Sequence, residues 1–461
     1  MDYNQKTNLR YLFEPRNVAV IGASAQSGKS GFNIVRNLRE WGFKGKIFPV
    51  NPNSSEILGV KTYPKVDAIA EEVETAIIAT PAPAVPDVMR DCVRKAIKGA
   101  IIISSGFSEE GQQQLETEVV NIAKEGAIRL IGPNTTGIIN TSLNFTSAFG
   151  PLQVIPQGDI AFIAQTGQFA GVMTDHITSS LHIGLSKVIG LGNKSDVDEA
   201  DVLDYLRDDV KTKVIAMYLE GVKDGRRFLT AAKETTRVKP VLLFKGGTTE
   251  AGSKVAISHT ASLAGREDIF NAACHQAGII RTQTFDELAE LALAFSLLPL
   301  PKGNNVGILS STGAVCVMLA DLACKAGLQI APLSPRTIGT LKEITPEWHN
   351  LSNPVDFWAA VEKVGLSKGY TIAIKALRSD ENIDSLIVHC GVLKGRGIQP
   401  FQVRGEEKPT VFSISGTKEP RDLLAKQLIN EGFPAYFSFH TAVRAISMIS
   451  WYARYVRQLG S

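Results

Sequence analysis

The stretch Val18–Gly31, "VAVIGASAQSGKSG", predicts a buried strand that leads into a loop of small residues. The loop comes close to two phosphate-binding motifs. A Walker A loop, G-x-x-x-x-G-K-[ST], needs glycine five residues before Gly28, where Ala23 stands. A dinucleotide fingerprint, G-x-G-x-x-G, needs glycine at position 26, where Gln26 stands. The loop alone therefore leaves its ligand open.

The composition indicates a globular protein with several cores. A length of 461 residues suggests about three domains, and a net charge of +3 without charge blocks or a basic stripe argues against a nucleic-acid partner. The polar N-terminus and the lack of an apolar run near ~20 residues predict a cytoplasmic protein without membrane contact. Five cysteines, odd in number and without a C-x-x-C pair, predict reduced thiols and no metal site.

Short β-branched runs alternate with longer amphipathic stretches, which predicts an α/β fold built on parallel sheets. Five strand candidates in the first 150 residues each end in small or polar residues. They are "NVAVIGA", "GKIFPVN", "TAIIAT", "GAIIISSG" and "IRLIGPN". Because ligands bind beyond the carboxyl ends of parallel strands, these five ends are expected to line one site.

Two later segments share a pattern of strand, polar residue, Thr-Gly and a small-residue helix start. They are "GDIAFIAQTGQFAGVMTDHI" and "NNVGILSSTGAVCVMLADLA", and a Pro- and Asn-containing linker, "LLPLPKGNN", precedes the second. These features predict domains at 1–152, 153–301 and 302–461. Backbone N–H groups at a helix start bind anions, so each turn is either a phosphate cradle or an ordinary capped connection. The candidate phosphate ligands are Gln165, Thr166, Gly167, Gln168, Ser311, Thr312, Gly313 and Ala314.

One of the seven histidines differs from the others in its neighbours. His259 lies in "KVAISHTASLAG", a run of small residues after the candidate strand "PVLLFKGG". Small neighbours leave an imidazole accessible, as a nucleophile requires. The other six histidines stand among apolar residues, on expected helices or in ordinary loops, where a structural imidazole is expected.

A nucleophilic histidine also needs an acceptor that fixes its tautomer. Glu220 ends the apolar run "KVIAMYLEG", at the ligand-binding edge of the predicted sheet. It would either orient His259 or pair at the surface with Lys223 or Arg226. Its place beside the strand that leads to His259 favours the first role.

The ordered motifs of the whole chain resemble the α subunit of NDP-forming acyl-CoA synthetases. The resemblance is greatest to the archaeal-type ADP-forming acetyl-CoA synthetases, relatives of succinyl-CoA synthetase. The motifs are "VAVIGAS", "VNPN", "ATPAPAVP", "GPNTTGIIN", "AQTGQFAG", "LGNKSDVDEADVLDYL", "YLEG", "SHTASLAG" and "NPVDFW". The resemblance implies an N-terminal Rossmann-like CoA-binding domain followed by two flavodoxin-like CoA-ligase domains.

The same resemblance assigns the opening loop to the phosphates of CoA. Its implied CoA contacts are Gly22, Ala23, Ser24, Lys29, Asn51, Asn53, Thr80, Pro81, Ser105, Gly106, Phe107 and Asn134. Related synthetases often carry a lysine in the "VNPN" loop, and this chain has none there. The implied catalytic residues are His259, which would carry a phosphoryl group, and Glu220, which would orient it.

The implied reaction is acyl-CoA + phosphate ⇌ acyl phosphate + CoA, followed by phosphoryl transfer to His259 and then to ADP. A loop around His259 with neighbouring glycines would swing between distant sites. No ATP-grasp-like stretch follows the third domain, so ADP/ATP and Mg are expected on a β subunit with an ATP-grasp domain, in an α2β2 heterotetramer.

Two other function classes remain open at this point. A noncatalytic CoA-binding regulator would need the first domain but not the His259 and Glu220 pair. The synthetase-like part of a protein acetyltransferase system would carry an added acetyltransferase fold. An NAD dehydrogenase fits less well, because the fingerprint fails and no acidic residue closes "GKIFPVN".

Overall fold

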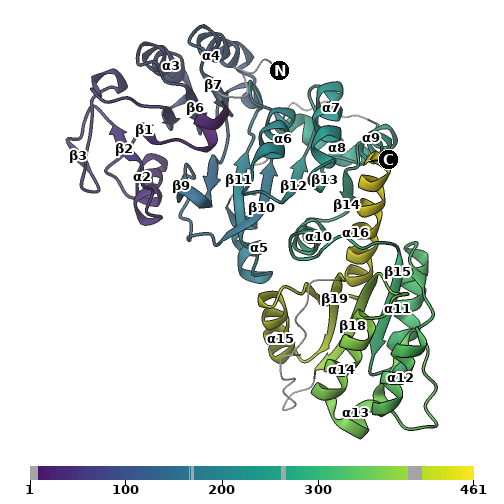
Figure 1. Ribbon diagram of the computed structural model, residues 1–461. Helices are drawn as coiled ribbons and strands as arrows, with labels where there is room; N and C mark the ends of the chain where they lie inside the picture. The colour runs from purple at the N-terminus through teal and green to yellow at the C-terminus, as the bar shows by residue number, and fades with distance from the viewer. Residues whose placement is uncertain (1–8, 166, 168–170, 261–265, 393–407, 461) are drawn as a thin grey trace. The chain divides into compact units, whose positions relative to one another are not determined.

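The computed structural model describes residues 9–460, apart from 166, 168–170, 261–265 and 393–407 (Figure 1). The chain divides into two compact units, Met1–Phe285 and Asp286–Ser461. In the described part of the chain, no helix is both long and apolar enough to cross a membrane.

The first sheet confirms the five predicted strands. It is parallel, in the order β2-β1-β5-β6-β7, so the strand order reverses between β1 and β5. Its elements are β1 (Asn17–Ile21), α2 (Ser30–Glu40), β2 (Lys46–Val50), β3 (Glu56–Ile57), β4 (Val60–Lys61), η1 (Val66–Ala68), β5 (Thr75–Ile78), η2 (Ala82–Ala84), α3 (Val85–Arg94), β6 (Gly99–Ile102), η3 (Ser108–Glu110), α4 (Gln113–Glu125) and β7 (Arg129–Ile131). Helices α3 and α4 cover one face of this sheet, and α2 covers the other (Figure 1).

The second sheet has the order β14-β13-β12-β10-β11-β8-β9, in which β10 to β14 are parallel and β8 and β9 pair antiparallel. Its strand order reverses at β10. The elements are β8 (Ile138–Asn140), η4 (Thr141–Leu143), β9 (Phe145–Thr146), β10 (Gln157–Ala164), α5 (Val172–Ser180), β11 (Leu185–Gly190), α6 (Glu199–Asp208), β12 (Val214–Leu219), α7 (Gly225–Thr236), β13 (Val241–Lys245), α8 (Glu250–Thr260), α9 (Glu267–Gln276) and β14 (Ile280–Thr282).

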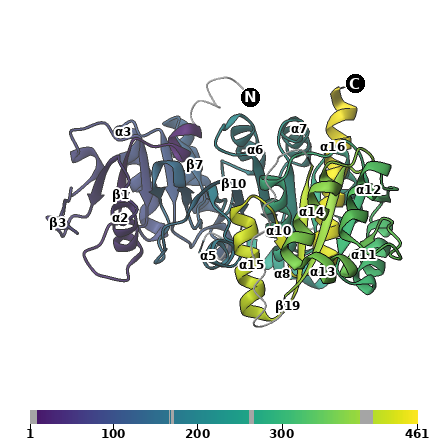
Figure 2. The ribbon, with the colours of Figure 1, turned by 60° about the horizontal axis from the view of Figure 1, so that its bottom comes forward.

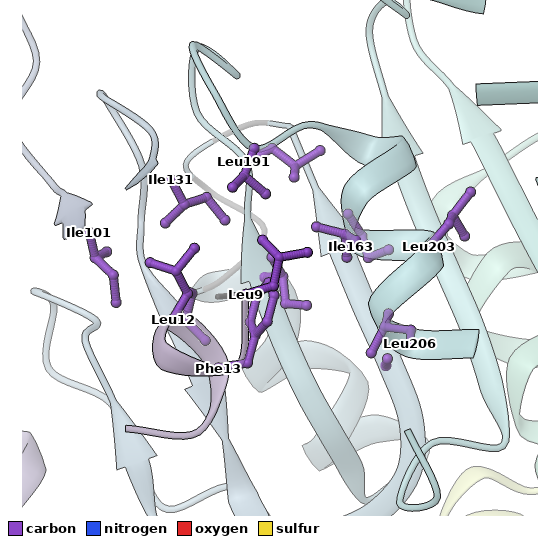
Figure 3. Packing of buried hydrophobic residues seen from close by; sticks show 14 of the residues in the cluster. Leu9, Leu12, Phe13, Ile101, Ile131, Ile163, Leu191, Leu203 and Leu206 are labelled. Atoms are coloured by element: carbon purple, nitrogen blue, oxygen red, sulfur yellow. The ribbon is translucent and has the colours of Figure 1, made fainter. Parts of the chain in front are cut away.

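The first two sheets share one apolar core. Residues 9–13 are helical, and Leu9, Leu12 and Phe13 pack with Ile131 of β7 and Leu191 after β11 (Figure 3). All of these side chains are fully buried, so their burial stabilises the two sheets together.

The second unit contains a third sheet in the order β16-β15-β18-β19-β20, with β17 paired to β15. Its elements are α10 (Phe285–Leu297, beginning at the last residue of the first unit), β15 (Asn305–Ser310), α11 (Gly313–Lys325), β16 (Gln329–Ile330), α12 (Pro335–Ile344), β17 (Val355–Asp356), α13 (Trp358–Val364), α14 (Leu366–Arg378), β18 (Ser385–Val392), β19 (Thr410–Gly416), α15 (Lys418–Asn430), β20 (Ala435–Tyr436) and α16 (Phe439–Gly460).

Side chains of the third sheet alternate between its two faces, as a strand requires. Leu386 and Val388 join a core with residues of α12, α14 and α15, whereas the ring of His389 lies against Phe439 of α16. Helix α15 lies at the β19–β20 edge of this sheet (Figures 1 and 2). The α/β class with parallel sheets is therefore confirmed.

Candidate active site

A cavity of about 290 Å³ lies where the strand order of the first sheet reverses. This is the position at which doubly wound sheets bind their ligands. The lining residues are Ile21, Gly22, Val50, Asn51, Pro52, Asn53, Pro64, Lys65, Val66, Thr80, Val88 and Asp91. Four of the predicted contacts, Gly22, Asn51, Asn53 and Thr80, therefore lie together in one cavity.

Gly22 is required by the geometry of this cavity. Its φ of +85° is left-handed, and a Cβ there would lie 2.8 Å from the backbone of Ala79. After the turn, helix α2 begins at Ser30 with Lys29 as N-cap and no side-chain cap. The uncapped N–H groups and the helix dipole make this turn suitable for a phosphate group.

The remaining contacts of this opening turn are ordered by hydrogen bonds. Asn51 Nδ2 donates to the carbonyl of Ala23 at 2.6 Å, and its Oδ1 accepts from the N–H of Asn53 at 2.7 Å. Ser24 Oγ accepts from the N–H of Gln26 at 3.0 Å, and Lys29 is exposed. The bond from Asn51 to Ala23 joins the loop after β2 to the loop after β1, and the other two bonds order each loop internally.

The cavity also contains a buried hydroxyl group, and a lysine that was not expected there. Thr80 Oγ1 is buried and has no hydrogen-bond partner among the described residues, so a ligand would satisfy it. Lys65, which precedes η1, is exposed and lines the cavity. It supplies a cation that the "VNPN" loop lacks, and no local motif predicts it because it follows the β3–β4 hairpin, away from the strand ends.

The other predicted CoA contacts lie in the loops after β5, β6 and β7, and these side chains differ in their exposure. Pro81 and Ser105 are exposed, but the Phe107 side chain is fully buried in the core. The N–H groups of Gly106 and Phe107 donate to Glu109 Oε1 at 2.7 and 3.2 Å. The Phe107 side chain therefore anchors this loop to the core of the first sheet.

Asn134 lies directly after β7 and has a left-handed φ of +57°. Its N–H donates to the carbonyl of Ser104 at 2.8 Å, which ties the loop after β7 to the loop after β6. Its side chain faces Asn193 from the second sheet, with Nδ2 at 3.5 Å from Oδ1. The predicted contact thus lies where the two sheets of the first unit meet.

Gln165 and Glu220 meet at the point where the strand order of the second sheet reverses. Gln165 follows β10, Glu220 follows β12, and Gln165 Oε1 accepts from the N–H groups of Glu220 and Gly221 at 2.9 and 3.1 Å. The two side chains are 5% and 9% exposed, so Glu220 is not the surface residue of the alternative reading. We call Gln165, Glu220 and Gly221 the Gln165 corner.

A lysine and a tyrosine contact Glu220. Lys245 Nζ donates to the Glu220 carbonyl at 2.8 Å, and burial lowers the pKa of this lysine. Tyr218 OH donates to Glu220 Oε1 at 3.3 Å, and burial together with the Glu220 charge raises the pKa of the tyrosine. A carboxylate held in this way is able to accept from an imidazole N–H.

His259 lies in the last turn of α8, where the sequence analysis expected a loop. Thr249 Oγ1 accepts from the N–H of Gly252 at 3.1 Å, and Lys254 pairs with Glu250 at 2.8 Å, which explains why this glycine-containing run is helical. Cα atoms of α8 lie within 8 Å of those of η3, so this helix lies beside the loop of Gly106. The residues that follow Thr260 lie outside the described part of the chain until Arg266.

The first Thr-Gly turn is described only in part. Thr166 and Gln168 lie outside the described residues, and Gly167 is exposed. The helix that was expected to begin at this turn, α5, begins at Val172.

The second Thr-Gly turn forms as predicted, because α11 begins at Gly313 with Thr312 as N-cap. Ser311 and Ala314 lie at this turn, and the N–H of Thr312 donates to Ser310 Oγ at 3.2 Å. A residue that the sequence analysis missed is Asp356, because a Cβ on Gly313 would lie 2.9 Å from its Oδ2. This carboxylate brings a negative charge to the helix start, which opposes the binding of a phosphate.

Behind this turn lies a buried histidine. His389 Nδ1 lies 3.1 Å from Ser310 Oγ and its Nε2 lies 2.9 Å from Ser415 Oγ, and burial lowers the pKa of this imidazole to about 4. The structural role predicted for it is confirmed. Within the described residues, no group of three or more His, Cys, Asp or Glu side chains is placed to hold a metal.

Two family models match the chain. The model described as "CoA binding domain" matches residues 16–141, and "Succinyl-CoA ligase like flavodoxin domain" matches residues 157–295. The first match contains the 290 Å³ cavity, and the second contains the Gln165 corner and α8.

Individual relatives match over nearly the whole chain. "Acetate--CoA ligase [ADP-forming] II" of Archaeoglobus fulgidus is 47% identical over 97% of this chain and 67% of that protein. "Acetate--CoA ligase [ADP-forming] I subunit alpha" of Pyrococcus furiosus is 38% identical over 96% of this chain and 97% of that subunit. The chain therefore spans about two thirds of the first protein and almost all of the second.

A solved structure shares the fold over the same extent. It is the dinucleotide-forming acetyl-coenzyme A synthetase 1 of Ca. Korarchaeum cryptofilum in complex with phosphate and ADP, with a TM-score of 0.90 and 31% identity. The match covers 98% of this chain and 99% of that chain. It agrees with a Rossmann-like first domain and flavodoxin-like ligase domains. The chain belongs to the family of ADP-forming acetate–CoA ligases.

Proposed function

We propose that this chain is the α subunit of an ADP-forming acyl-CoA synthetase with acetyl-CoA as the reference substrate. The observation that carries the proposal is the Gln165 corner, where an amide side chain and a buried carboxylate lie at the reversal point of the second sheet. Helix α8, with His259, lies beside the CoA-side loop of the first sheet. On this proposal, one chain supplies the CoA site, the phosphate site and the nucleophile.

In the proposed first step, the CoA part of acyl-CoA lies in the cavity with Gly22, Asn51, Asn53 and Thr80, and Lys65 adds a positive charge to this cavity. A phosphate oxygen attacks the thioester carbonyl carbon, the C–S bond breaks, and the CoA thiolate leaves. The products are acyl phosphate and CoA. The backbone N–H of Gly167 is proposed to hold a phosphate oxygen, whereas the Asp356 carboxylate at the Gly313 helix start argues against the second Thr-Gly turn as a phosphate site.

In the proposed second step, a neutral imidazole nitrogen of His259 attacks phosphorus. The P–O bond to the acyl group breaks, and the free acid leaves as its carboxylate. Glu220 would accept a hydrogen bond from the other ring nitrogen and offset the positive charge that forms on the ring. A glutamine in place of Glu220 could still accept the hydrogen bond but would carry no negative charge.

The final acceptor of the phosphoryl group is proposed to lie on a partner. The Pyrococcus furiosus relative is named as an α subunit, and the Korarchaeum structure holds phosphate and ADP. On this basis we propose a β subunit with an ATP-grasp domain that binds ADP and Mg, an α2β2 assembly and a cytoplasmic location. The boundaries 1–152, 153–301 and 302–461 are part of the same proposal.

The overall reaction provides the test. The chain and its partner subunit, mixed with acetyl-CoA, phosphate, ADP and Mg, should form ATP, acetate and CoA in equal amounts. Omission of phosphate should abolish all three products, because phosphate is the nucleophile of the first step. Release of acetate and CoA without phosphate would instead indicate a thioesterase and contradict the proposal.

A further inference from the structure

A short segment between β11 and α6, residues 192–195, connects the two halves of the candidate active site. We call it the GNKS segment. Gly192 has a φ of +60°, and a Cβ on it would lie 2.2 Å from the carbonyl oxygen of Pro133. Lys194 is also left-handed, with a φ of +56°, although it is not glycine. Such a conformation is retained only when the surrounding contacts fix it.

Asn193 binds to the loop after β6, which carries predicted CoA contacts. Its Nδ2 donates to Glu109 Oε2 at 2.6 Å, while the other oxygen of Glu109 accepts from the N–H groups of Gly106 and Phe107. The carboxylate of Glu109 therefore connects Asn193 to the backbone of the loop after β6. Displacement of Asn193 would release this loop.

Glu116 of α4 is a second acceptor for the amide of Asn193. It accepts from Asn193 Nδ2 at 2.9 Å, from the Ser108 N–H at 3.1 Å and from Ser195 Oγ. Burial by itself would raise the pKa of Glu116, but the hydrogen bonds from Ser108, Ser195 and Asn193 outweigh it and lower the pKa. Glu116 is thus held as a carboxylate, which keeps the amide of Asn193 in place.

Lys194 binds to the Gln165 corner, which lies at the proposed phosphate site. Its Nζ donates to the Gly221 carbonyl at 2.7 Å and lies 3.3 Å from Gln165 Oε1 and 3.0 Å from Glu199 Oε2. The ammonium group thus donates hydrogen bonds to two acceptors and forms an ion pair with Glu199. Because Gln165 Oε1 also accepts from the Glu220 and Gly221 N–H groups, the ammonium fixes the position of the Gln165 corner.

A buried ammonium at this place requires an explanation. Lys194 and Glu199 are 2% and 1% exposed, and a buried ion pair is at best a weak source of stability. The same unit contains a second buried pair, Lys187 and Asp209, with a distance of 2.6 Å and exposures of 1% and 6%. Within the described part of the chain, Lys187 contacts Asp209 and the ring of Tyr205 and not the Gln165 corner, so it offers a matched comparison.

We propose that Asn193 and Lys194 are positioning residues that tie the CoA-side loop and the Gln165 corner together through one backbone segment. This inference rests on the proposed function for the roles of the two ends. Asn193 orders the loop that receives CoA, and Lys194 orders Gln165 and the peptide that carries Glu220. The segment touches both ends but contributes no group to the reacting atoms.

The experiment compares single substitutions in the full chain by CoA calorimetry and by the rate of phosphohistidine labelling from acetyl-CoA and labelled phosphate. Lys194→Met should raise the KM for phosphate at least tenfold and leave the CoA Kd within twofold. Asn193→Asp, which places a charge against Glu109 and Glu116, should raise the CoA Kd at least tenfold and leave the phosphate KM unchanged. Lys187→Met should lower the melting temperature and change neither value.

Further variants and a crystal structure make every outcome decisive. If Lys194→Met does not fold, Lys194→Met with Glu199→Gln removes the unpaired charge and takes its place. The variant's crystal structure should show Gln165 displaced from the Glu220 N–H. A retained Gln165 corner with a wild-type phosphate KM, or an equal effect of Lys187→Met, would overturn the inference. If the wild-type chain takes no label, the proposed function fails and the crystal structure alone decides the positioning role.

Discussion

Replacement of Gln165 by leucine is expected to destabilise the first unit and to abolish phosphate use. The side-chain oxygen accepts from two buried backbone N–H groups at 2.9 and 3.1 Å and lies 3.3 Å from the Lys194 ammonium. Leucine has a similar size but no acceptor, so at least two buried donors lose their partner. Each such loss costs about 1–3 kcal/mol, part of which the added apolar contact offsets, which gives a net loss of about 3 kcal/mol.

Differential scanning calorimetry measures this loss. For a unit of this size, about 3 kcal/mol corresponds to a decrease in melting temperature of about 6 °C. Gln165→Glu is the matched variant, because a carboxylate keeps the acceptor and should lower stability by less than about 1 kcal/mol. It adds a negative charge beside the proposed phosphate site, so its phosphohistidine labelling should still decrease. A melting temperature of Gln165→Leu within about 1 °C of wild type would refute the role assigned to these hydrogen bonds.

Three further predictions concern the cavity of the first sheet and the pH dependence of the second unit. Gly22→Ala should lower the free energy of unfolding, measured with denaturant, by about 1–3 kcal/mol more than Gly28→Ala does. Both glycines are left-handed, but only a Cβ on Gly22 would meet backbone atoms. Equal losses for the two variants would argue against this close approach. Lys65→Ala should weaken CoA binding about tenfold at low salt, whereas Lys61→Ala, outside the cavity, should not, as calorimetry would show. Burial raises the pKa of Glu290 to about 7, so the folded state binds more protons than the unfolded state above pH 4.5, and stability should decrease towards pH 8 by about 3 kcal/mol. Glu290→Gln should remove this decrease from the thermal unfolding profile, and an unchanged profile would exclude this carboxyl group as its cause.

Much of the fold was predictable because the signals are local. The β-branched runs end in small or polar residues where the strands end, so the strands and the place of Gly22, Asn51 and Thr80 followed from the sequence. Glu220 was predicted in the same way, because a carboxylate directly after an apolar strand lies at the ligand-binding edge.

The features that escaped prediction depend on contacts between segments far apart in the chain. Lys65 reaches the cavity only through the β3–β4 excursion, and Asp356 approaches Gly313 because β17 pairs with β15. The sequence around Lys194 predicts a loop, and the burial of this lysine depends on two hydrogen-bond acceptors and one ion-pair partner from three other segments. Phe107 was expected in the crevice because its loop is there, but its side chain turns into the core.

The helix α8 was missed for a different reason. Its sequence contains glycine and serine, which lower helix propensity, whereas the Thr249 cap and the Glu250–Lys254 pair compensate for them. Tertiary contact with η3 adds to these local terms.

Phosphohistidine formation is the most direct test of the central claim, because it separates an enzyme from a CoA-binding regulator. The chain alone, incubated with acetyl-CoA and labelled phosphate, is predicted to acquire a label that is acid-labile and base-stable, as expected for phosphate on an imidazole nitrogen. His259→Ala should abolish the label, and His275→Ala on α9 should retain it. Addition of the partner subunit with ADP should then transfer the label to ATP. A full label on His259→Ala, or an acid-stable label of the kind formed on serine, would contradict the account.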